Sequence, residues 1–187
     1  MADTGWVSPG TVVNDDAIGD WMWCSVNNAK ENDDIPVDGY DYGSGEDSNY
    51  LKATNFGLEV PSGATINGIL VEIRHEGYSD YSNNTENIVS IVKHDGSIGS
   101  TNQSTNAVLP VDYTYISYGS SSDLWGETWS ATDINDEDFG VVFSVSFSNS
   151  YNGAFVDHIQ IKVYYTESTD TPVIGNKYPL PAFKNIT

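Results

Sequence analysis

Two long runs near the end of the chain, residues 139–148 and 154–165, alternate between apolar and polar positions, and they restrict the fold more than any other feature. A period of two is typical of half-buried antiparallel strands. Residues 149–153 between the runs are rich in asparagine, serine and glycine, so we expect the runs to pair as a hairpin. Because a hairpin is only marginally stable alone in water, it has to pack on a second layer.

The alternation also predicts which side chains of the second run face the core. Phe155 and Asp157 share a face with the apolar row of residues 159–165, whereas Val156 and His158 belong to the opposite face. We therefore expect Asp157 and His158 to point in opposite directions and not to form a pair.

Shorter strand-like segments separated by turn residues fill the rest of residues 1–168. The β-branched and aromatic residues favour sheet, and no helical stripe exceeds about three turns. Residues 132–138 are expected to form one short helical turn, capped by Thr132 or Asp133. We predict an all-β fold, an antiparallel β-sandwich of the jelly-roll type with about eight or nine strands in a single domain, residues 1–168.

Residues 20–26 are expected to form an early strand of this sandwich. Trp21 and Trp23 lie on one face of the strand, and Met22 and Cys24 lie on the other. Because both faces are apolar, we expect burial on both sides. Cys24 is the single cysteine, so an intramolecular disulfide is excluded and a buried thiol is expected.

The net charge of −20, from 27 acidic and 7 basic residues, excludes several classes of partner. Nucleic acid and anionic membrane surfaces are repelled, and no basic stripe offsets this. The N-terminus lacks the pattern of a signal peptide, and no apolar stretch is long enough to span a membrane. If the protein acts outside cells, we expect release by lysis or by a specialised route.

The C-terminal segment, residues 169–187, differs from the acidic body. It contains three prolines, which favour extended backbone, and residues 177–187 carry a charge of +2. One interpretation is a disordered tail. The other is an arm that docks on a partner or a neighbouring copy through basic and apolar side chains, namely Lys177, Tyr178, Leu180, Phe183 and Lys184.

A stretch of acidic and glycine residues, 27–49, has the composition of a solvated surface loop. The alternative is a calcium site, because calcium takes six to eight oxygen ligands, largely carboxylates and carbonyls. The spacing does not match the EF-hand loop. The candidate ligands are Asp33, Asp34, Asp38, Asp41 and Asp47.

The search for catalytic residues gives none. The three histidines, His75, His94 and His158, are scattered, and with one cysteine they do not form a zinc motif. The acidic group at 133–138 is explained by a capped helical turn. We therefore predict a protein without enzymatic activity. A glycan-cleaving enzyme is the remaining alternative, because the two carboxylates that such an enzyme needs meet only in the fold.

Tyrosines in polar loops are the remaining clue to function. Rings of this kind stack on sugars while polar neighbours bind hydroxyl groups, and tyrosine is also favoured in protein interfaces. Packing at the edge of the core is the simplest alternative. The candidate ligand-binding residues are Tyr40, Tyr42, Tyr78, Tyr81, Tyr113, Tyr115 and Tyr118.

Three phrases, FGLEVPSGATINGILVEI, DLWGETWSATDINDEDFGVVF and VDHIQIKVYYT, resemble elements of jelly-roll structural proteins of tailed bacteriophages over about residues 5–166. The resemblance implies a capsid decoration, head-fibre or tail-associated protein on the virion surface, extracellular after lysis. Its partners would be capsid or tail proteins, in a homo-oligomer such as a trimer. The same architecture is similar to carbohydrate-binding modules, so a glycan- or receptor-binding module, with or without calcium, is the alternative.

Overall fold

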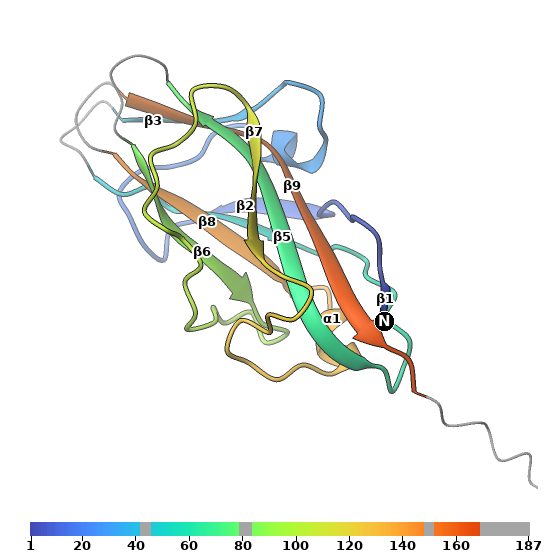
Figure 1. Ribbon diagram of the computed structural model, residues 1–187. Helices are drawn as coiled ribbons and strands as arrows, with labels where there is room; N and C mark the ends of the chain where they lie inside the picture. The colour runs from blue at the N-terminus through green and yellow to red at the C-terminus, as the bar shows by residue number, and fades with distance from the viewer. Residues whose placement is uncertain (42–45, 79–83, 148–151, 169–187) are drawn as a thin grey trace, which may run out of the picture.

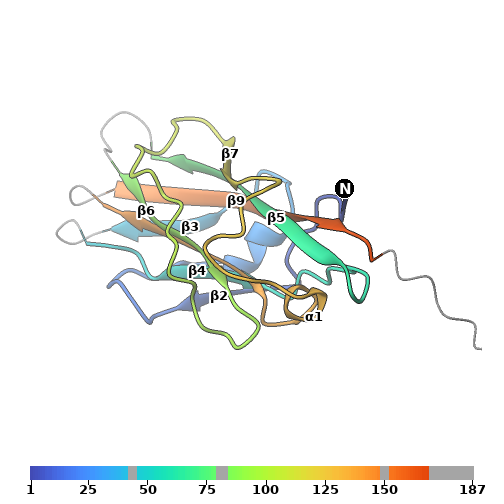
Figure 2. The same ribbon diagram turned by 60° about the horizontal axis from the view of Figure 1, so that its bottom comes forward.

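The computed structural model describes residues 1–41, 46–78, 84–147 and 152–168, and over these ranges the chain forms two antiparallel sheets packed as a sandwich. Figures 1 and 2 show the sheets as two layers. The all-β sandwich predicted from the alternating runs is confirmed.

The first sheet has β9 (Asn152–Thr166) and β5 (Thr65–Gly77) at its centre and β7 (Thr114–Gly119) at one edge. Both β1 (Ala2–Asp3) and β3 (Val37–Asp41) pair with the other side of β9, at opposite ends of it. The second sheet has the order β2 (Thr11–Asp15), β4 (Tyr50–Thr54), β8 (Gly140–Ser146) and β6 (Thr85–Val92).

The core lies between the two sheets and consists of the inward rows of the long strands. Ile69, Val71 and Ile73 of β5 have no exposed surface, and the same holds for the apolar residues of β8 that face them. Trp125 fills the space beside β5, where its indole nitrogen donates to the carbonyl oxygen of Ile69 at 3.0 Å. Burial of apolar rows from both sheets stabilises the sandwich.

The predicted hairpin of residues 139–148 and 154–165 is wrong. The first run becomes β8, which pairs with β4 and β6, whereas the second becomes β9, which pairs with β5 in the other sheet. The chain therefore crosses between layers where a tight turn was expected. The six residues from Gly140 to Val145 are all buried, which is typical of a central strand covered on both sides and not of a half-exposed hairpin.

The predicted facing of residues 155–157 is also wrong, because β9 contains a bulge. Arg74 of β5 pairs with His158, but the next residue, His75, pairs with Val156, so Asp157 is an extra residue in the ladder. The bulge shifts the alternation by one position, as an inserted residue must. Val156 faces the core with no exposed surface, and Phe155 is only half-buried.

The expected strand at residues 20–26 forms only isolated bridges, followed by a 3-10 helix, η1 (Val26–Lys30). Trp23 is buried as expected, but Met22 and Cys24 are exposed, so the predicted burial of the thiol is wrong. Alternation identifies the correct inner face, and the side chains of the outer face are exposed.

The helical turn predicted at 132–138 is present as α1 (Ala131–Ile134). Its N-cap is Ser130 and not Thr132 or Asp133. The Ser130 hydroxyl accepts from the backbone of Asp133, whose carboxylate accepts in return from the Ser130 backbone N–H. This reciprocal capping box satisfies two amides that the first turn leaves without partners. In the described part of the chain, no helix is long and apolar enough to cross a membrane.

Candidate functional site

The outer face of β7, β5 and β9 carries an ordered set of polar and aromatic side chains. Antiparallel register places residues of the three strands side by side in rows. One row joins Tyr115, Arg74 and His158, and the next joins Ser117, Glu72 and Gln160. Together with Trp6, Ser8, Tyr113 and Lys162, these residues are called the outer face below.

Tyr115 reaches across the sheet to His158. Its hydroxyl lies 2.8 Å from Nδ1 of the imidazole, and Ser8 Oγ lies 2.8 Å from Nε2, so both ring nitrogens are hydrogen-bonded. Burial lowers the pKa of His158; the charge of Asp157 opposes this shift and that of Arg74 adds to it. The imidazole is therefore neutral at neutral pH, with one nitrogen donating and the other accepting. The phenol and the imidazole hold each other in place.

Arg74 is held by two carboxylates and a ring. Its Nη1 forms ion pairs with the buried Asp157 and, at 2.7 Å, with Asp34. The guanidinium carbon lies 5.0 Å from the centre of the Tyr113 ring. Burial raises the pKa of Tyr113, and the nearby carboxylate of Glu76, which its hydroxyl contacts, raises it further. The phenol is therefore protonated and serves as a hydrogen-bond donor and as a ring surface.

Glu72 lies at the centre of the outer face between two neutral donors. Gln160 Nε2 donates to Oε2 at 2.7 Å, and Ser117 Oγ donates to Oε1 at 3.1 Å. Each carboxylate oxygen keeps a lone pair for a further donor. At the edge of the face, Lys162 Nζ lies 4.4 Å from the ring centre of Trp6, whose side chain is 37% exposed.

The predicted tyrosines separate into different environments. Tyr113 and Tyr115 are on the outer face, whereas Tyr118 is a core residue whose hydroxyl donates to the buried Glu86 at 2.8 Å. Tyr78 is exposed just after β5, with its ring 6.5 Å from that of Phe155. Tyr42, Tyr81 and the side chain of Tyr40 lie outside the described residues.

Several residues of the outer face were not candidates from the sequence: Trp6, Ser8, Glu72, Arg74, Gln160 and Lys162. The alternation of β9 already placed Gln160 and Lys162 opposite the apolar row. One sequence does not show which strands are neighbours. The pairing that brings Glu72 next to Gln160, and Trp6 next to Lys162, could therefore not be predicted.

The candidate calcium ligands whose side-chain contacts the structure describes, Asp33, Asp34 and Asp47, lie apart. Asp34 pairs with Arg74 at the first sheet, whereas Asp47 bridges to Ser146 in the second. Asp33 accepts from the backbone of Ile35, and the side chain of Asp41 lies outside the described residues. Within the described ranges, no group of three acidic, histidine or cysteine side chains is arranged to hold a metal ion. The predicted arm, with Lys177, Tyr178, Leu180, Phe183 and Lys184, is also outside the described residues.

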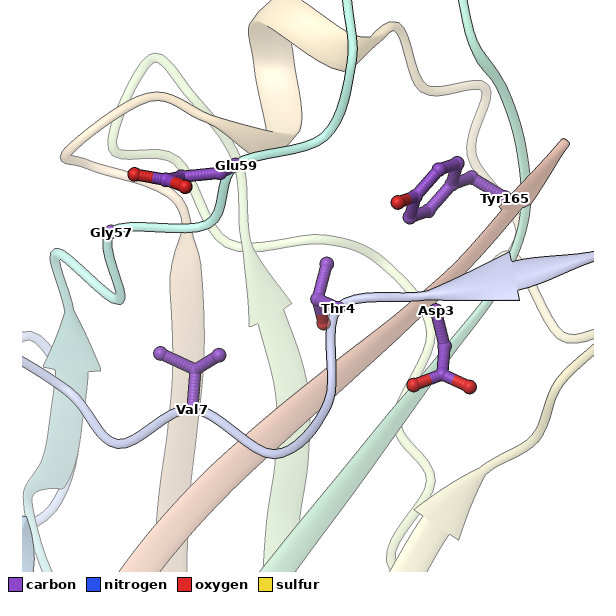
Figure 3. Close-up of a pocket in the computed structure, with 6 residues that line it drawn as sticks. All are labelled: Asp3, Thr4, Val7, Gly57, Glu59 and Tyr165. Atoms are coloured by element: carbon purple, nitrogen blue, oxygen red, sulfur yellow. The ribbon is translucent and has the colours of Figure 1, made fainter. Parts of the chain in front are cut away.

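A pocket of about 350 Å³ lies near the end of β9 (Figure 3). Its lining comes from the N-terminal segment, from the segment after β4 and from Tyr165 of β9. It offers one ring and the carboxylates of Asp3 and Glu59. The outer face provides more rings and more fixed hydrogen-bonding groups than this pocket, which makes it the stronger candidate for recognition.

No family model and no curated protein matches the chain. Among solved structures, it is similar to the CBM22-1–GH10 modules of endo-1,4-β-D-xylanase 10B from Clostridium thermocellum, complexed with xylohexaose, with 13% identity and a TM-score of 0.38. That match covers 88% of this chain and only 28% of the xylanase chain. The CBM22-1 xylan-binding domain of Paenibacillus barcinonensis Xyn10C matches with 10% identity and a TM-score of 0.36, over 87% and 88% of the two chains. Neither similarity is close enough to carry a function to this chain.

Proposed function

We propose that this protein is a non-catalytic carbohydrate-binding module whose binding surface is the outer face of β7, β5 and β9. The observation that carries the proposal is the placement of Tyr115 and Trp6 beside hydrogen-bonding groups that the sheet holds in fixed positions. Tyr115 is fixed by His158, and Glu72 is fixed by Gln160. A sugar needs both features, because its ring faces are apolar and its edge carries hydroxyl groups.

In this proposal, the rings of Trp6 and Tyr115 stack on sugar faces, and Glu72 and Gln160 bind hydroxyl groups. A fixed site binds with a smaller loss of side-chain freedom than a mobile one. The net of hydrogen bonds that joins Ser8, His158 and Tyr115 therefore favours recognition. A sheet face that is simply exposed to solvent, without a binding role, would not require such a hydrogen-bond network.

The role as a bacteriophage virion protein stays a prediction. It depends on residues 169–187, which lie outside the described ranges, and on capsid or tail partners. A glycan-binding face on the sandwich is compatible with display on a particle.

A glycan array tests the proposal, followed by titration calorimetry on any hit. We expect binding by the full chain, with and without calcium, and loss of at least about 1 kcal/mol of binding free energy in Trp6→Ala and Gln160→Ala. Thr11→Ala, an exposed change on β2 of the other sheet, is the matched control and should bind as the parent does. If no glycan binds, or if the control loses as much affinity as the two variants, the proposal is wrong.

A further inference from the structure

The two cations of the outer face are already engaged. Arg74 contacts Asp34 and Asp157 through one nitrogen, and its side chain is only 18% exposed. The ammonium group of Lys162 lies over the ring of Trp6, where the face of the indole attracts it. An anionic ligand would have to displace one of these contacts before it could form an ion pair.

Glu72 is in the opposite situation. Its two partners, Gln160 and Ser117, are neutral, and Glu72 takes part in none of the ion pairs found within the described ranges. The side chain is half-buried in the middle of the face, between β7 and β9. Half-burial reduces the screening of its charge by water, so a cation that binds there gains more than it would at a fully exposed carboxylate.

The surroundings of Glu72 are also negatively charged. The carboxylates on this side of the sheet include Asp34, Glu72, Glu76, Asp112 and Asp157, against the cations Arg74 and Lys162. The whole chain carries −20. Such a field attracts cationic ligands over a distance and repels polyanions.

We propose that the preferred ligands of the outer face are amine-bearing glycans, with the protonated amine of a glucosamine-type unit bound at Glu72. The inference rests on the function proposed above and defines its ligand class. The ammonium group accepts no hydrogen bonds and donates three, and both oxygens of Glu72 still have acceptor capacity. The rings of Trp6 and Tyr115 then contact the sugar units on either side.

The experiment compares three oligosaccharides of equal length by titration calorimetry at mildly acidic pH, where the sugar amine is protonated: β-1,4-linked glucosamine, its N-acetylated form and β-1,4-linked glucose. We expect the amine form to bind at least about tenfold more tightly than the other two at low salt, the size of a hydrogen bond between charged groups. The preference should shrink at high salt because exposed charges are screened.

Glu72→Gln should remove the preference, so that the variant binds the amine form no more tightly than the neutral oligosaccharides. Glu59→Gln removes the same charge at the separate pocket near β1 and is the matched control, which should keep the preference. Thermal melting of each variant shows that the body remains folded. Equal binding of amine and neutral forms, or a preference that survives in Glu72→Gln, would overturn this inference and leave the proposed function standing. Failure of all three oligosaccharides, together with an empty glycan array, would overturn both.

Discussion

Arg74 and Asp157 form an ion pair in which the carboxylate side chain has no exposed surface. The pair exists because the bulge in β9 turns Asp157 toward the guanidinium, out of the alternation that its position in the sequence predicts. A buried carboxylate without a cation is costly, so the pair couples the bulge to the stability of the sandwich. It also fixes Arg74 beneath the ring of Tyr113.

Replacing Arg74 by methionine should lower the free energy of unfolding by about 3–5 kcal/mol, because Asp157 would remain buried without its cation. Chemical denaturation measures this loss. Lys162→Met removes a cation from the same face that has no buried carboxylate partner, and it should cost less than about 1 kcal/mol. The double variant Arg74→Met, Asp157→Leu should recover much of the loss. A cost in Arg74→Met no larger than that in Lys162→Met would show that the ion pair does not matter for stability.

The bulge also marks the limit of what the sequence can predict. Alternation correctly identified the inward row at Ile159, Ile161 and Val163, because local side-chain period and burial agree there. One extra residue reverses the facing of residues 155 and 156, and no composition signal marks it.

Two other errors have the same physical origin, since the period of a strand does not specify its neighbours. The run that became β8 is buried on both faces, in the main core on one side and, on the other, through packing of Val142 with Tyr50 and Val92. Its sheet partners are β4 and β6, so the hairpin was the wrong partner choice. The sequence places Tyr118 in or near a polar loop, but pairing with Val71 points its side chain into the core. Long-range register decides both cases.

His75 makes stability depend on pH. It is fully buried between the sheets, and desolvation lowers its pKa from 6.5 to about 4. Between these two values the unfolded chain binds a proton that the folded chain does not, so this group destabilises the fold progressively as pH falls from about 6.5 to about 4. The lowered pKa corresponds to a loss of about 3 kcal/mol in the free energy of unfolding. The actual loss should not exceed this value, because Glu86, 3.8 Å from Nε2, favours the charged imidazole.

Denaturation curves of the parent and of His75→Asn at pH 7.5, 6 and 4.5 test this dependence. The many carboxylates of the chain contribute to both proteins, so the difference between the two curves isolates His75. We expect the advantage of the parent over the variant to diminish as pH falls. A difference that is constant across the three pH values would contradict the assignment.

Gly119 is required where β7 ends against Trp125. Its φ is +79°, and a Cβ there would overlap the carbonyl oxygen of Ile69 and lie 2.7 Å from the indole nitrogen of Trp125. Those two atoms form the hydrogen bond that holds the indole in the core. Gly119→Ala should therefore destabilise the fold by more than about 3 kcal/mol, from backbone strain combined with overpacking.

Gly96→Ala is the matched control for Gly119→Ala. Gly96 has nearly the same backbone angle, φ +78°, but a Cβ would meet nothing within 4 Å. We expect a cost of about 1 kcal/mol from strain alone, measured by the same denaturation experiment. Similar costs in the two variants would mean that the packing of Trp125 tolerates the added methyl group.

Two substitutions of Tyr115 distinguish the contribution of its ring to glycan binding from that of its hydrogen bond to His158. Tyr115→Phe keeps the ring and removes the hydroxyl that contacts His158 at 2.8 Å. Under the proposed function, the phenylalanine variant should lose about 1 kcal/mol or less of glycan-binding free energy, because the ring is less firmly held. Tyr115→Ala should lose about 1–3 kcal/mol more, because the stacking surface disappears. Calorimetric titration of both variants with the same oligosaccharide gives the comparison. If the Tyr115→Ala and Tyr115→Phe variants bind the oligosaccharide equally well, stacking on Tyr115 plays no part. Recognition would then have to depend on Trp6 and the polar row around Glu72.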